Sequence, residues 1–566
     1  FSFIFRKFAP ETDDRILVTG AGDCKVRVHD VECTRRGNAS GDSAIQVYGC
    51  HFARVKRVAA HRQEPHVILS AGEDGLVMQY DLREPADCRS FCNHALINLN
   101  AHLGPDCEIK CLALNPLRPE MMAIGANDHF VRVYDRRMIA PKPVKLSYDG
   151  SRRVLWDRSA ILSLNIENID YNFPPNSVQY FIAGHLPVKC ADRRNRFRRL
   201  TTTYLTFDPS GKSLLVNLGG EQIYLFDLYD EKKTSLLEDF RRFFVDEKSP
   251  EILKGIKFAP ADHSRNIFLI NRSPNNTPNL PFRVQLLKQK ANSEFDRENF
   301  DSALALYSRA LEQSPKTAIL YSNRAAAYMR RDWDGDTYAA LRDCYTTLHL
   351  EPENLKALFR LCKCLYELNQ YHSAQCCLEI FMQKYPEQAQ SHSCIKLWNE
   401  VSSSIKNDKN SDSPTNKRQR TFENNSGATS HQQQNQDLST DSANGERDEL
   451  YSNLTPTSNN FLSDQEKSLQ SRAYDYCKRY CGHCNTTTDI KEANFFGCNG
   501  EYVMGGSDDG KFFIWDSRTC EIVKAMVGDD KIVNCLQPHP TQCLLATSGI
   551  EHTVKNQLYP FTPSIP

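Results

Sequence analysis

The chain of 566 residues contains no run of about 20 apolar residues, the length that an α-helix needs to cross a bilayer. Its first residues, FSFIFRKF, are too short for a signal peptide and lack a cleavage pattern. Both absences argue against a membrane partner. The chain also begins without Met and inside a strand pattern, so we expect it to be a piece of a longer protein.

An excess of charge of one sign is lacking too, because 70 Lys and Arg residues balance 70 Asp and Glu residues. We therefore expect no direct binding to nucleic acid. The 21 cysteines are scattered rather than dense, which excludes a small disulfide scaffold and predicts reduced thiols in a cytoplasmic and nuclear protein. No catalytic triad, paired acids, cofactor motif or metal-ligand set is recognisable, so we expect neither an enzyme nor a cofactor.

A repeated pair of alternating strands is the main pattern that is present. It is clearest in residues 501–518, EYVMGGSDDGKFFIWDSR, where two strands flank a tight turn. The same pattern recurs at 15–30, 67–83, 122–137 and 213–227 and, in degenerate form, at 532–558. It predicts an all-β WD-repeat propeller with six recognisable blades and a seventh in the intact protein. In the 501–518 blade we expect His483 to hydrogen-bond Asp509 and Trp515 to pack at the hub.

The period becomes helical between residues 282 and 401. Small and aromatic residues stand where paired helices pack in tetratricopeptide repeats, at Ala291, Phe295, Phe300, Ala303, Tyr307 and Ala310. Pro315, Pro352 and Pro386 end three successive units of about 34 residues. We expect three repeats, capped by an amphipathic helix that carries Ile395, Trp398 and Val401.

These patterns divide the chain into five segments. Residues 1–230 form the first part of the propeller, 231–281 a turn-rich linker and 282–401 the all-α repeat domain. Residues 402–470 are rich in Ser, Asn and Gln and should be disordered, and 471–566 form the rest of the propeller. The helical domain is thus expected as an insert between blades.

Long strings carry a family resemblance, namely AGHLPVK (183–189), NRAAAYM (323–329), WDGD (333–336), RYCGHCNTTTDIKEANFFG (479–497) and IVNCLQPHP (532–540). Together with the order of repeats, they resemble a family of WD and tetratricopeptide repeat proteins that are substrate receptors of cullin-4 RING E3 ubiquitin ligases. The resemblance implies a non-catalytic scaffold that acts in protein ubiquitination, restrains fat storage and binds histones and a histone deacetylase. The competing hypothesis is a co-chaperone or corepressor scaffold that is independent of ubiquitin.

Two neighbouring blades end in an Asp-x-Arg sequence, at Asp81-Leu82-Arg83 and Asp135-Arg136-Arg137. Their guanidinium groups should emerge on one face, where they suit bidentate pairing with a partner. The resemblance implies that this pair docks on the damaged-DNA-binding adaptor of the ligase. The alternative is that each Arg pairs with an acid of a neighbouring blade. A third copy, Asp516-Ser517-Arg518, stands alone and favours this alternative.

The first helices of the three repeats carry a second cluster, Lys288, Asn292, Asn323, Lys356 and Arg360. Spacing of four residues places each cation and its partner on one helix face, on the concave side of the stack. The cluster resembles the carboxylate clamp with which co-chaperones bind the acidic C-terminal tails of Hsp70 and Hsp90. The alternative is a solvated basic face.

Cys481-Gly482-His483-Cys484 spells a redox motif, and Cys477 could add a zinc ligand. The residues that follow alternate as a strand, whereas the redox motif requires a helix. We therefore interpret these cysteines as structural.

Overall fold

The computed structural model describes residues 5–558 except for 33–43, 85–90, 104–106, 146, 149–153, 156–176, 187–199, 230–279, 412–467, 471, 489, 498, 540, 541 and 543. In this part of the chain, no helix combines the length and the apolar character that crossing a membrane requires.

Among the described residues, six antiparallel sheets of three to five strands form the main β part of the molecule. Alternation of buried and half-buried residues, as in Val26–Asp30, gives each strand one face toward a neighbouring sheet, while middle strands such as Met121–Ala126 are buried on both faces. The first sheet consists of β1 (Phe5–Phe8), β2 (Ile16–Gly20), β3 (Val26–Asp30) and β4 (Ala44–Tyr48), and the second of β5 (Val55–His61), β6 (Glu64–Gly72), β7 (Leu76–Asp81), β8 (Phe91–Asn98) and β12 (Lys142–Lys145). The third consists of β9 (Ile109–Leu114), β10 (Met121–Ala126), β11 (Val131–Asp135) and β15 (Val178–Phe181), and the fourth of β16 (Thr201–Phe207), β17 (Ser213–Gly219), β18 (Ile223–Asp227) and β19 (Lys478–Tyr480). The fifth consists of β20 (Ala493–Phe496), β21 (Tyr502–Gly506), β22 (Lys511–Asp516) and β23 (Ile522–Val527), and the sixth of β24 (Val533–Pro538), β25 (Leu544–Gly549) and β26 (Val554–Leu558).

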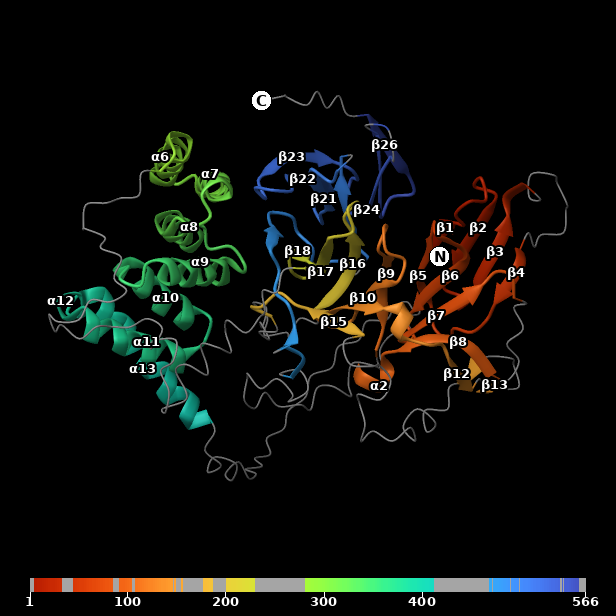
Figure 1. Ribbon diagram of the computed structural model, residues 1–566, viewed down its shortest axis with the longest axis horizontal. Helices are drawn as coiled ribbons and strands as arrows, with labels where there is room; N and C mark the ends of the chain where they lie inside the picture. Colours follow the sequence, from red (N-terminus) through yellow and green to blue (C-terminus); the bar gives the residue numbers. More distant parts are fainter. Residues whose placement is uncertain are drawn as a thin grey trace, which may run out of the picture.

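The sheets follow one another around a common axis as the blades of a propeller (Figure 1). The first strands of successive sheets contact one another, β1 with β5, β5 with β9, β9 with β16, β16 with β20 and β20 with β24. Across the axis, Arg57 of the second sheet pairs with Glu492, which precedes β20 of the fifth, at 2.9 Å. The expected WD-repeat propeller is thus confirmed with six blades. The expected seventh blade is not found among the described residues and stays a prediction.

The helical domain interrupts one blade, so the expected position between two blades is wrong. Strand β18 precedes the insert and β19 follows it, yet the two strands pair, with Ile223 opposite Tyr480 and Leu225 opposite Lys478. The fourth strand of this blade is therefore supplied from beyond the helices. Most of the expected linkers, 231–281 and 402–470, lie outside the described residues.

The insert stands beside the ring as a stack of antiparallel helix pairs (Figure 1). Its helices are α6 (Phe282–Asp296), α7 (Phe300–Gln313), α8 (Ala318–Arg331), α9 (Asp336–Leu350), α10 (Leu355–Glu367), α11 (Tyr371–Lys384), α12 (Pro386–Ala389) and α13 (His392–Ser411). The last helix, α13, packs on α11 and caps the stack, as expected, but extends to Ser411 rather than ending at 401. Its buried residues include Cys394, Leu397, Val401 and Ile405, whereas Ile395 is 50% exposed, so its expected place in the cap is wrong.

Short elements complete the described structure. They are α2 (Asn100–Leu103), the 3-10 turn η1 (Arg136–Met138) and a hairpin of β13 (Ser147–Tyr148) with β14 (Val154–Leu155).

Candidate functional site

The two Asp-x-Arg sequences lie at the ends of β7 and β11, which are corresponding strands of neighbouring blades. Each Arg folds back on its own Asp. Arg83 donates from Nη2 to Asp81 Oδ2 at 2.6 Å and from Nε to Oδ1 at 2.9 Å, and Arg137 donates to Asp135 at 2.7 and 3.0 Å in the same way. The side chains of Arg83 and Arg137 remain 68% and 71% exposed.

This pairing holds both guanidinium groups in defined positions on the surface. The hydrogen bonds from Arg83 lower the pKa of Asp81 to about 2, and those from Arg137 lower the pKa of Asp135. Both carboxylates are therefore ionised at neutral pH. Because each guanidinium is already oriented, it loses less side-chain freedom when it binds a partner than a free arginine does.

Under the alternative interpretation, Arg137 would pair with an acid of a neighbouring blade. Arg136, the middle residue of the second Asp-x-Arg sequence, makes that contact instead. Its Nη1 atom pairs with Glu64 of the preceding blade at 2.7 Å, and its Nη2 atom donates to Gln79 Oε1 at 3.0 Å. The Arg136 side chain is only 8% exposed. The pairing ties the second blade to the third, so Arg83 and Arg137 are presented on a fixed pair of sheets.

The third copy differs in its side-chain contacts. Asp516 accepts hydrogen bonds from the backbone nitrogens of Arg518 and Thr519, both at 2.9 Å, and caps the turn after β22. The Arg518 side chain is exposed and forms no ion pair within the described part of the chain. The structure therefore does not give Arg518 the neighbouring-blade partner that the sequence favoured.

The clamp residues fall on α6, α8 and α10, and three of them form hydrogen bonds within the helical domain. Asn292 Oδ1 accepts from Tyr307 Oη at 2.6 Å and from Asn323 Nδ2 at 3.2 Å. Arg360 donates to the carbonyl oxygen of Ser322, beside Asn323, at 2.8 Å. Three side chains of the cluster are therefore held by hydrogen bonds and are not independent solvated groups.

The two lysines of the cluster have no acidic partner in the described structure. Lys356 is exposed and Lys288 half-buried, and neither ammonium group pairs with an acid of the described residues. The sequence did not identify Tyr307 as part of the site, because its spacing is equally that of a core residue.

The expected hydrogen bond between His483 and Asp509 is wrong. Neither ring nitrogen of His483 has a hydrogen-bond partner in the described structure, and Asp509 pairs with Lys511 at 3.4 Å. Burial, with the Lys491 charge nearby, lowers the pKa of His483 to about 4, so the ring is neutral. Trp515 is fully buried, as expected, and donates from Nε1 to the Cys481 carbonyl at 2.9 Å.

The blade of β5 to β8 contains the kind of histidine–aspartate bond that was expected in the 501–518 blade. His51 Nδ1 lies 2.8 Å from Asp74 Oδ2, and His51 Nε2 lies 2.6 Å from Ser70 Oγ. Gly505 occupies the position in the 501–518 blade that Ser70 has here, and a Cβ atom there would lie 2.5 Å from Ile223. Sequence reasoning missed His51, although the spacing from Gly49-Cys50-His51 to Asp74-Gly75 was a usable signal.

Cys481 and Cys484 are both free thiols in the described structure. Cys481 is buried and burial raises the pKa of its thiol, the opposite of a reactive cysteine. Cys484 is exposed. Among the described residues, no group of three or more His, Cys, Asp and Glu side chains is arranged to hold a metal ion.

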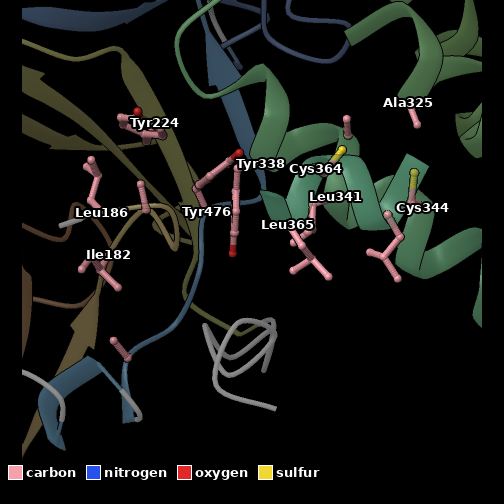
Figure 2. Close-up of a cluster of buried hydrophobic side chains, with 14 of the residues drawn as sticks. Ile182, Leu186, Tyr224, Ala325, Tyr338, Leu341, Cys344, Cys364, Leu365 and Tyr476 are labelled. Atoms are coloured by element: carbon pink, nitrogen blue, oxygen red, sulfur yellow. The ribbon is translucent and has the colours of Figure 1, made fainter. Parts of the chain in front are cut away.

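A buried joint holds the helical domain against the propeller. Figure 2 shows Ile182, Leu186, Tyr224 and Tyr476 of the propeller in one hydrophobic cluster with Tyr338 and Leu341 of α9. Polar bonds surround it. Tyr338 Oη donates to Asp475 Oδ2 at 2.9 Å, and Arg479 pairs with Asp336, which also binds Arg331 at 2.8 Å.

The joint coincides with three of the strings that carry the resemblance. Gly184 and His185 come from AGHLPVK, Asp336 from WDGD and Arg479 from RYCGHC. Burial, with Arg479 and Arg342 adding to it, lowers the pKa of His185 to about 3, and its Nε2 atom lies 3.2 Å from Tyr224 Oη. These strings therefore build the contact between the domains.

Comparisons with known proteins agree with this architecture. The model of the TPR repeat matches residues 291–331, and that of the WD domain, G-beta repeat, matches residues 475–516. Human WD and tetratricopeptide repeats protein 1 is 41% identical over 561 residues, which cover 97% of this chain and 75% of the relative. Protein ALTERED SEED GERMINATION 2 of Arabidopsis thaliana is 27% identical, with 99% of this chain and 79% of the relative covered.

A shorter match connects the chain to a further human protein. DDB1- and CUL4-associated factor 6 is 53% identical over 76 residues, 13% of this chain and 9% of the relative. Among solved structures, the first TPR of Spaghetti (RPAP3) bound to an HSP90 peptide aligns at a TM-score of 0.20 and 22% identity, over 22% of this chain and 94% of that one. The length and identity of the match to human WD and tetratricopeptide repeats protein 1 show that the chain belongs to the family of that protein.

Proposed function

We propose that the protein is a non-catalytic substrate receptor of a cullin-4 RING ubiquitin ligase. The propeller would dock on the damaged-DNA-binding adaptor through Arg83 and Arg137. The observation that carries the proposal is the pair of exposed, pre-oriented guanidinium groups on neighbouring blades. The local identity to a human protein named for DDB1 and CUL4 supports it.

A pull-down of the purified adaptor by the full chain tests this proposal. Charge reversal in the double variant Arg83→Glu/Arg137→Glu should abolish capture, because two acids would replace the only contacts that the proposal requires. Both side chains are largely exposed, so the fold should be retained. The matched control is Arg518→Glu, which reverses the Arg of the third copy and should leave capture unchanged.

Capture that survives the double variant would contradict the receptor role. It would favour the competing scaffold that is independent of ubiquitin. Binding to histones and a deacetylase stays a prediction in either case.

A second candidate function is recognition of acidic C-terminal tails by the helical domain. The hydrogen bonds of Asn292 with Tyr307 and Asn323, and that of Arg360 with the Ser322 carbonyl, favour it over a solvated basic face, because these side chains are already held in position. Charge-assisted bonds to a terminal carboxylate require such a cluster of donors.

Titration calorimetry with a Glu-Glu-Val-Asp tail peptide tests the clamp. Binding should require the free terminal carboxylate and should be lost in Lys356→Ala, whereas the exposed α6 variant Lys290→Ala should bind normally. Equal binding of the C-terminally amidated peptide would remove the clamp.

A further inference from the structure

The turns that follow the third strand of five blades share one geometry. In each turn, the Asp that ends the strand accepts a hydrogen bond from the backbone nitrogen two residues later, at 2.9 to 3.0 Å. The residue at that second position therefore emerges on the same face of the ring in every one of these blades. From the first blade to the fifth, these residues are Glu32, Arg83, Arg137, Tyr229 and Arg518.

Tyr229 thus occupies in the fourth blade the position that Arg83 and Arg137 occupy in the second and third. Its side chain is 58% exposed. The Arg118 guanidinium carbon lies 5.2 Å from the centre of its ring, so the ring is held from one side while the other stays open. Tyr and Arg are among the residues that most often carry the binding energy of protein interfaces. The row therefore indicates a contact surface that is wider than the two arginines.

The β9–β10 turn joins the third and fourth blades at this face. Its Pro119 carbonyl accepts a hydrogen bond at 2.8 Å from Nη1 of Arg136, the neighbour of Arg137. Its Arg118 contacts Tyr229 of the fourth blade. Because one turn touches both positions, Arg137 and Tyr229 belong to one continuous surface.

Two apolar side chains extend this surface. Leu117 of the β9–β10 turn is 59% exposed, and Met138, which follows Arg137 in η1, is 39% exposed. We call Leu117, Met138 and Tyr229 the apolar cluster. A single exposed apolar residue is ordinary, but three on adjoining turns next to oriented arginines have the composition of an interface, with apolar contacts in the middle and charges around them.

The two arginines need such a cluster to bind a partner stably. Each guanidinium is largely exposed and already paired with its own Asp. Exposed ion pairs contribute little affinity by themselves, because water and salt screen them. Stable interfaces add apolar surface that the partner covers. The apolar cluster offers that surface on the same face.

We propose that the apolar cluster is the hydrophobic part of the surface that docks on the ligase adaptor, with Tyr229 as its anchor. The proposal rests on the proposed receptor function. Glu32, 55% exposed in the first blade, would repel acidic groups and so limits the contact on that side. The acidic groups of the adaptor would therefore face Arg83 and Arg137, and an apolar pocket of the adaptor would face the third and fourth blades.

Biolayer interferometry with immobilised adaptor and the full chain in solution tests the proposal. Tyr229→Ala should weaken binding about tenfold, because it removes the anchor from the adaptor pocket. Tyr229→Phe keeps the ring and should bind as the wild type does. The matched control is Phe282→Ala, which removes an aromatic side chain that is 82% exposed on α6 and should change nothing. All three positions are exposed, and thermal unfolding checks that the fold is retained.

Salt separates a direct apolar contact from an effect on the nearby charges. At about 1 M salt, charges are screened within about 3 Å, whereas apolar contacts persist. The tenfold difference between wild type and Tyr229→Ala should therefore remain. A difference that disappears at high salt would mean that Tyr229 acts only by holding Arg118, and it would overturn the apolar cluster.

The arginine variant distinguishes this proposal from the receptor role. Full binding of Tyr229→Ala together with loss in Arg83→Glu/Arg137→Glu would overturn the apolar cluster and leave the receptor role. Loss in Tyr229→Ala with full binding of the arginine variant would keep the cluster and overturn docking through the arginines. An equal loss in Phe282→Ala would show unspecific apolar adhesion and overturn the cluster, and a wild type that does not bind the adaptor would overturn both proposals.

Discussion

At the scale of single residues, two histidines in equivalent blade positions have different surroundings. His51 is completely buried and bonded through both ring nitrogens, to Asp74 and to Ser70. Asp74 also accepts from the backbone nitrogens of Phe52 and Leu76, both at 3.1 Å. His483 has only ring packing, 5.5 Å from the centre of Trp515. The first residue is therefore part of a polar network and the second is part of the apolar core.

We predict that His51→Ala lowers the free energy of unfolding of the propeller by about 3 kcal/mol. The substitution leaves a cavity and removes a partner from the buried Asp74 carboxylate and the buried Ser70 hydroxyl. The matched variant His483→Ala loses packing alone and should cost less. Urea unfolding followed by the fluorescence of the buried Trp515 measures both, and equal losses would contradict the difference in roles.

At the scale of elements, the joint between α9 and the propeller depends on a close approach of the backbone. A Cβ atom at Gly184 would lie 2.1 Å from Tyr338 Oη, whose hydroxyl is bonded to the buried Asp475. We predict that Gly184→Ala displaces Tyr338 and destabilises the joint by about 2 kcal/mol. Hydrogen exchange of α9 should rise. The control is Gly49→Ala, whose Cβ atom would meet nothing within 4 Å, and unchanged exchange in Gly184→Ala would show that the joint repacks freely.

The same joint should respond to acid through His185. Its folded-state pKa of about 3 lies below the ordinary value of 6.5, so the unfolded chain binds a proton first as the pH falls. The stability that the neutral ring contributes is complete above pH 6.5 and is lost between about pH 6.5 and pH 3, at up to about 1.4 kcal/mol for each pH unit. Urea unfolding at pH 7 and pH 5 should show a smaller pH effect in His185→Gln than in the wild type.

Elements of this kind mark the limit of what the sequence predicts. Alternation and turn residues predict the strand pair of β21 and β22, and small and aromatic residues such as Ala291 and Tyr307 predict the helix pairs, because both signals are local. The bond between Tyr338 and Asp475 joins residues 137 positions apart. A sequence gives no period for such a contact, so the joint and the blade that the insert interrupts could not be predicted.

At the scale of the whole molecule, one ion pair links opposite sides of the ring. Arg57 of the second blade and Glu492 at the fifth lie 435 positions apart in sequence and 2.9 Å apart in space. Their side chains are 17% and 11% exposed, and Arg57 also lies 4.8 Å from the ring centre of Tyr204 in the fourth blade. The pair thus connects blades that come from either side of the helical insert. Both parts of the chain must be folded before it can form.

We predict strong coupling between these two residues. Arg57→Met leaves a mostly buried carboxylate without its partner and should cost about 3 kcal/mol, and Glu492→Gln should cost a similar amount because it strands the guanidinium. The double variant should lose at least about 1 kcal/mol less than the sum of the two. Urea unfolding of all four proteins measures the coupling.

The exposed pair Lys511 and Asp509, at 3.4 Å, is the matched control and should couple by less than about 1 kcal/mol. Additive losses for Arg57 and Glu492 would mean that the two sides of the propeller are held together by sheet packing alone.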